Sequence, residues 1–99
     1  MPSSLTRFEV VLPNTDNGTP QQTAVNDFID SLVTLCDVEM YSAYIYPKNS
    51  NHSTLTSQNI LYGLLSSGQQ STALGFLTTL NSALGTTVPC FISTVTTEP

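Results

Sequence analysis

Apolar residues between positions 19 and 36 recur at the spacing of an amphipathic helix. They occupy Ala24, Val25, Phe28, Ile29, Leu32, Val33 and Cys36. Thr19 is a favourable N-cap, and Pro20 suits the first helical position because its missing N–H would have no partner there. Gln22 stands three residues after Thr19, as in a capping box. The pattern therefore predicts a helix over residues 19–36, whose apolar stripe needs a surface to cover.

Alternating and β-branched patterns predict strands on both sides of this helix. Residues 5–12 alternate between two faces and are followed by a run of turn formers. Residues 38–46 are rich in β-branched and aromatic side chains, which favour strands. Residues 88–96 also indicate a strand, and Pro89 near its start predicts either an edge position or a strand that begins just after it.

The middle of the chain is ambiguous. Residues 55–65 fit either a short helix or a strand, and Gly63 weakens both interpretations. We favour the strand, because the polar loop 47–54 after a well-marked strand suits a hairpin. Residues 69–84 again carry apolar side chains at helical spacing, and Gly85 is well placed to end that helix.

The predicted element order is strand–helix–strand twice, which resembles the ferredoxin-like fold. The resemblance rests on element order over nearly the whole chain, without a sequence motif. Right-handed crossovers in both units would give an antiparallel four-stranded sheet in the order 4-1-3-2, with both helices on one face. We therefore expect an α+β sandwich with the order βαββαβ, formed by residues 1–99 as a single domain.

Composition and charge exclude several kinds of partner. The 99 residues are 39% hydrophobic and 9% charged, so the predicted surface is polar but largely neutral. Arg7 and Lys48 are the only basic residues against seven acids, for a net charge of -5. Nucleic acids and anionic membrane surfaces are therefore not expected to bind.

Two further patterns concern location. No apolar run approaches the ~20 residues that a membrane-spanning helix requires. The first residues, MPSSLTRFEV, lack the basic and apolar regions of a secretory signal, so we expect a cytoplasmic protein.

Residues able to carry chemistry are few. The predicted topology places Cys36 and Cys90 at opposite ends of the sheet, too far apart for a disulfide, so both are interpreted as small buried residues. His52 lies in a polar loop, where a solvated side chain is expected. No metal-ligand spacing, nucleophile motif or phosphate-binding glycine loop occurs. We expect no cofactor and no metal, and whether the chain is an enzyme stays open.

The face of the sheet away from the helices is the best candidate for function. If Phe8, Val10 and Leu12 face the helices, Arg7 and Glu9 face the other way. Either phase of the strand 38–46 leaves a tyrosine on that helix-free face, and Tyr62 adds another if the segment 55–65 is a strand in the matching register. The candidate ligand-binding residues are Arg7, Glu9, Tyr41, Tyr44 and Tyr62.

Two interpretations fit such a face. Tyrosine and arginine are enriched at oligomer interfaces, and they also orient ligands in largely apolar pockets. The two are compatible, because ferredoxin-like domains of the dimeric α+β barrel type pair face to face and enclose a cavity. Cofactor-free oxygenases and ligand-binding domains are among them.

Our first hypothesis is therefore a small homodimeric ferredoxin-like domain that binds a small, mostly apolar ligand between its sheet and the partner's. The alternative is a non-enzymatic accessory protein, such as a viral or mobile-element product, that acts through protein–protein contact. A neutral surface rich in Ser, Thr and Asn motivates this alternative.

Overall fold

The computed structural model describes residues 3–97. Its elements follow one another as β1 (Ser3–Leu12), α1 (Pro20–Val33), β2 (Val38–Ile45), β3 (Thr56–Leu65), α2 (Gln70–Leu84) and β4 (Cys90–Thr97). The predicted order βαββαβ is confirmed. The strand favoured for residues 55–65 is also confirmed, as β3.

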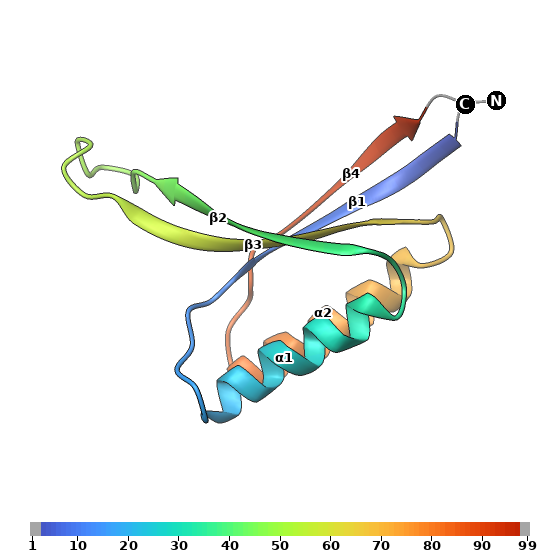
Figure 1. Cartoon of the computed structure of the whole chain (residues 1–99), viewed down its shortest axis with the longest axis horizontal. Helices are drawn as coiled ribbons and strands as arrows, with labels where there is room; N and C mark the ends of the chain where they lie inside the picture. The colour runs from blue at the N-terminus through green and yellow to red at the C-terminus, as the bar shows by residue number, and fades with distance from the viewer. Residues whose placement is uncertain (1–2, 98–99) are drawn as a thin grey trace.

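The strands form one antiparallel sheet in the order β2-β3-β1-β4, which is the predicted order 4-1-3-2 read from the other edge. Both helices lie on the same side of this sheet (Figure 1). The core between the layers contains Phe8 and Val10 of β1, Leu61 of β3, Leu32 of α1 and Leu80 of α2, each at most 2% exposed. Burial of each such large side chain contributes about 1.5–3 kcal/mol.

The start of α1 agrees with the prediction in one of two respects. The Thr19 side chain accepts a hydrogen bond of 3.2 Å from the Gln22 amide, as an N-cap should. The second half of the capping box is absent from the described residues, because the Gln22 side chain bonds elsewhere. It accepts from the Thr15 hydroxyl and donates to Asn26. The prediction of a reciprocal box was therefore wrong.

The end of α1 also differs from the prediction, which extended the helix to Cys36. The helix ends at Val33, and Thr34 is its C-cap. Val33 is 56% exposed, although the apolar stripe placed it on the core side. Leu35 and Cys36 still contact the core, but from the turn that follows the helix. Apolar spacing thus continued past the last helical residue.

A single amide side chain joins the two turns at this end of the domain. Gln69, just before α2, donates a hydrogen bond of 3.0 Å to the carbonyl oxygen of Leu35 in the turn after α1. Its Oε1 atom accepts a hydrogen bond of 3.0 Å from the Ser66 amide. Gln69 therefore holds the connection between α1 and β2 against the connection between β3 and α2.

The end of α2 and the start of β4 agree with the prediction. Gly85 ends α2 in the left-handed conformation, at φ +71°, which a glycine adopts without strain. The Asn81 side chain then accepts a hydrogen bond of 2.9 Å from the buried Val88 amide. β4 begins at Cys90, directly after Pro89, and it lies at the edge of the sheet. Both predictions made from Pro89, an edge position and a strand that begins just after it, are therefore confirmed.

β2 and β3 continue as a hairpin beyond the helices, as Figure 1 shows. Residues 46–55 connect them, and Lys48 in this connection is exposed. Three non-glycine residues, Asn49, Asn51 and His52, adopt positive φ angles there. The His52 and Tyr46 rings are nearly perpendicular, with centroids 6.3 Å apart.

Both cysteines are free thiols, and both are partly rather than fully buried, which corrects the expectation of full burial. Burial raises the pKa of each thiol above its usual value, and the Asp37 carboxylate adds to the effect at Cys36.

Within residues 3–97, neither helix has the length and hydropathy needed to cross a bilayer.

Candidate functional site

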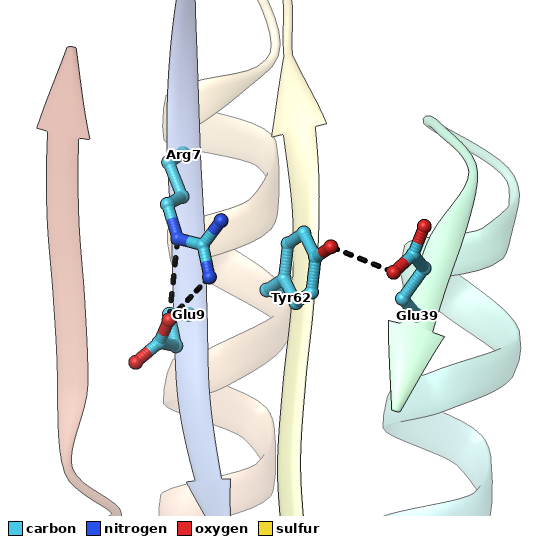
Figure 2. A network of polar contacts seen from close by, with 4 residues as sticks. All are labelled: Arg7, Glu9, Glu39 and Tyr62. Atoms are coloured by element: carbon cyan, nitrogen blue, oxygen red, sulfur yellow. Dashed lines mark hydrogen bonds and ion pairs between the residues drawn. The ribbon is translucent and has the colours of Figure 1, made fainter. Parts of the chain in front are cut away.

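Strand pairing brings four of the five candidate residues to the helix-free face. Glu9 on β1 lies opposite Tyr62 on β3, and Tyr62 in turn lies opposite Glu39 on β2. Arg7 is two residues from Glu9 on β1, and Tyr41 is two residues from Glu39 on β2, so their side chains point to the same face. In Figure 2 the helices lie behind the sheet and the side chains of Arg7, Glu9, Tyr62 and Glu39 lie in front of it.

Arg7 is held by a carboxylate and an aromatic ring. Its Nη2 and Nε atoms donate to Oε1 of Glu9, at 2.9 and 3.2 Å. Its guanidinium carbon lies 4.0 Å from the centroid of the Tyr62 ring, a cation–π contact. The hydrogen bond that Arg7 donates to the Glu9 carboxylate raises the pKa of Arg7 above its ordinary value, so the side chain is always cationic. Within residues 3–97 its hydrogen bonds use only Nε and Nη2, which leaves Nη1 to a ligand.

Tyr62 is fixed at both its ring and its hydroxyl. The hydroxyl donates a hydrogen bond of 2.6 Å to Oε2 of Glu39 (Figure 2). This bond is the main reason that the pKa of the Tyr62 phenol lies above its ordinary value. The Tyr41 ring meets the Tyr62 ring edge-on, with centroids 6.0 Å apart. Tyr62 therefore joins a cation, a carboxylate and a second aromatic ring.

Apolar side chains surround this polar cluster. Leu64 lies opposite Arg7 in the β1–β3 pair, and Phe91 lies opposite Glu9 in the β1–β4 pair. Phe91 is 59% exposed, Tyr41 43% and Leu64 38%. Large side chains are thus left in solvent around the Arg7–Glu9 ion pair.

A shallow depression of about 280 Å³ lies beside Tyr62, between β2 and β3. Asp37, Glu39, Gly63 and Leu64 complete its lining. In one copy of the chain this depression is open, so a ligand held here would need a further surface to cover it.

Tyr44 does not join the other four candidates. Its side chain points to the same side of β2 as those of Met40 and Ser42, which is the helix side of the sheet, and it is 74% exposed near the end of the strand. Glu39 and Phe91, in contrast, belong to the cluster and were not among the predicted residues. The alternation of residues 38–46 placed Glu39 with Tyr41, but only the pairing with β3 brings it to Tyr62.

The cluster offers a ligand the two N–H groups of Arg7 Nη1, an aromatic ring and surrounding apolar side chains. Within residues 3–97, no group of three or more His, Cys, Asp and Glu side chains is arranged to hold a metal ion. The arrangement can therefore orient the polar end of a small molecule while apolar side chains contact the rest of it.

Neither protein-family models nor curated protein sequences give a match to this chain. Solved structures do. CPII, a nitrogen regulatory PII-like protein from Thiomonas intermedia K12 bound to ADP, AMP and bicarbonate, is similar with a TM-score of 0.64 at 10% identity, over 100% of this chain and 98% of that one. A second structure of CPII, bound to ADP, AMP and acetate, gives a TM-score of 0.61 at 13% identity, over 100% and 93% of the two chains.

A DUF3240 family protein from Shewanella baltica OS155 gives a TM-score of 0.54 at 11% identity, over 94% of this chain and 88% of that one. At such low identities the likeness concerns the fold. The fold is ferredoxin-like. The resemblance that the element order indicated is thereby confirmed, and it extends over the whole chain.

Proposed function

We propose that this chain is a cytoplasmic, homodimeric ligand-binding domain. The helix-free face of one sheet lies against that of a second copy, and a small, mostly apolar molecule is held between them. The observation that carries this proposal is the Arg7–Tyr62 pair, an oriented cation on an aromatic ring in the middle of an exposed apolar face.

Exposure supports the second copy. Phe91, Tyr41 and Leu64 lie on three different strands of one face, and all three are more than a third exposed. Large apolar side chains exposed together on one face are typical of interaction sites, and aromatic residues with arginine are typical of interface centres. Pairing two such faces would also cover the open depression beside Tyr62.

Charge supports the choice of ligand. CPII is described with ADP, AMP and bicarbonate, and these two nucleotides carry two phosphate groups and one, respectively. Here Arg7 and Lys48 are the only basic side chains, and Glu9 already neutralises Arg7. We therefore propose a ligand with a single polar end, such as a hydroxyl, carbonyl or carboxyl group on an apolar body, and we expect no binding of nucleotides.

Two matched tyrosines test the dimer. Tyr41 and Tyr44 lie on the same strand and face opposite sides of the sheet. Size-exclusion chromatography with light scattering should give the wild type and Tyr44→Glu twice the protomer mass of 10.7 kDa. Tyr41→Glu should give the protomer mass, because it places a charge in the interface. A wild type that is monomeric at every concentration would overturn the proposal, and the accessory role would then be the remaining hypothesis.

The two basic residues test the ligand site. Native mass spectrometry of freshly purified protein should show a retained small molecule in the wild type and in Lys48→Gln, and none in Arg7→Gln. Thermal melts with about 1 mM ADP or AMP should show no stabilisation. Loss of the molecule from both variants, or its absence from the wild type, would contradict the role of Arg7. A clear stabilisation by ADP would contradict the proposed ligand class.

A further inference from the structure

A second site lies on the other side of the molecule, between the two helices. Four positions of α1 with the spacing i, i+3, i+4 and i+7 face four positions of α2 with the same spacing. They are Ala24, Asp27, Phe28 and Ser31 on α1, and Phe76, Thr79, Leu80 and Ala83 on α2. These residues line most of a groove of about 440 Å³. It shares no residue with the cluster around Arg7.

The groove is apolar at its base. Phe28 and Leu80 form the floor and are 3% and 2% exposed, while the Phe76 ring is half-buried beside them. Ala24 and Ala83 occupy positions where longer side chains would fill the space between the helices. The volume falls in the range of small-molecule pockets and suits a ligand with one ring system.

The rim of the groove presents hydrogen-bond acceptors. The Thr79 hydroxyl donates to the Gly75 carbonyl at 3.2 Å, and the Thr23 hydroxyl donates to the Thr19 carbonyl at 3.4 Å. Because each hydroxyl has one hydrogen to donate, both oxygens can only accept from a ligand in these geometries. A ligand that supplies N–H donors therefore fits these two threonines.

The charge of the groove is negative. Asp27 is the one ionisable residue in its lining, and its exposed carboxylate makes no hydrogen bond or ion pair within residues 3–97. Neither basic side chain is near, since Arg7 lies on the opposite face of the sheet and Lys48 lies in the β2–β3 connection. The net charge of -5 adds a general attraction for cations.

We propose that the groove between α1 and α2 binds small aromatic amines in their cationic form. The ring would lie on Phe28, Phe76 and Leu80, and the ammonium group would donate to Asp27 and to the threonine hydroxyls. This site is independent of the function proposed for the helix-free face, since no residue of either is needed by the other.

Three indole compounds of similar size and different charge test the proposal. Tryptamine is a cation at neutral pH, tryptophol is neutral and indole-3-propionate is an anion. Titrations of the full chain followed by amide chemical shifts should map tryptamine to residues around Phe76 and Ala83, and not to the strands around Tyr62. Tryptamine should bind about two- to five-fold more tightly than tryptophol at low salt, as an exposed ion pair allows. Indole-3-propionate should bind more weakly than either.

Two carboxylates on the same helix provide the matched control. Asp27→Asn should remove the advantage of tryptamine over tryptophol, whereas Asp30→Asn, outside the groove, should keep it. Ala83→Leu should fill the groove and weaken tryptamine and tryptophol alike, with an unchanged amide spectrum elsewhere. The proposal is overturned if tryptamine does not bind, if it binds no better than tryptophol, or if the two asparagine variants behave the same. Arg7→Gln should leave tryptamine binding unchanged, which separates this site from the other.

Discussion

A Cβ atom added to Gly63 on β3 would lie 2.6 Å from the Sγ atom of Cys36 in the turn after α1. The same atom would lie 3.1 Å from the carbonyl oxygen of Asp37, which belongs to the backbone and cannot rotate away. Gly63 is fully buried at this point. The strand can therefore pass under the turn only because residue 63 has no side chain.

The contact predicts a coupled pair of substitutions. Gly63→Ala should lower the free energy of unfolding by about 1–3 kcal/mol, as overpacking of a core does. In a Cys36→Ala background the same change should cost clearly less, because the sulfur atom is gone and only the carbonyl contact remains. Urea unfolding of the four proteins measures this coupling. Strictly additive losses would show that Cys36 is not what excludes a side chain at residue 63.

Adjacent residues at the end of α1 predict opposite responses to a charge. Leu32 is completely buried, whereas Val33 is 56% exposed. Leu32→Asp should leave the domain unfolded at room temperature, because an unpaired carboxylate would lie in the core. Val33→Asp should change the free energy of unfolding by less than about 1 kcal/mol. Circular dichroism and thermal melts distinguish the two, and similar melts would mean that the helix is rotated from the orientation described.

The Tyr62–Glu39 hydrogen bond predicts a loss of stability in alkali. It raises the folded-state pKa of the Tyr62 phenol above the ordinary value of 10.0. The corresponding stabilisation is fully present below that value and is lost as the pH rises through the folded-state pKa. Urea unfolding at about pH 9 and about pH 11 should therefore show a smaller decrease for Tyr62→Phe than for the wild type. Tyr44→Phe should decrease as the wild type does, and an equal decrease in all three proteins would contradict the prediction.

The sequence predicted the fold well because each element carries its own signals. Thr19 and Pro20 mark the start of α1, and Gly85 marks the end of α2 with a backbone angle that few other residues tolerate. The end of α1 carries no such signal. Leu35 and Cys36 remain apolar because the turn also contacts the core, so periodicity alone placed the helix end three residues too late.

The candidate site was predicted only in part, for a reason that concerns β2. Alternation shows which side chains of a strand share a face. Which of the two faces points to the core can be predicted only where one face is clearly more apolar than the other. On this edge strand Tyr41 and Tyr44 are both exposed, so neither face is marked as the inner one. Glu39 was missed because its contact with Tyr62 depends on the register of the β2–β3 pair, which the long connection between the strands leaves undetermined.

Lys48 lies at a position where a cut would divide the chain into two halves. It is the single lysine, it is exposed, and it lies in the connection between β2 and β3. Brief trypsin treatment of the folded protein should cut after Lys48 and spare Arg7 within β1, which leaves two pieces of nearly equal length, β1-α1-β2 and β3-α2-β4. In the sheet order β2-β3-β1-β4 the strands of the two halves alternate, so each half lies between strands of the other. We therefore expect the nicked protein to stay together as a non-covalent heterodimer of interleaved fragments, which would suit the intact domain to a split reporter.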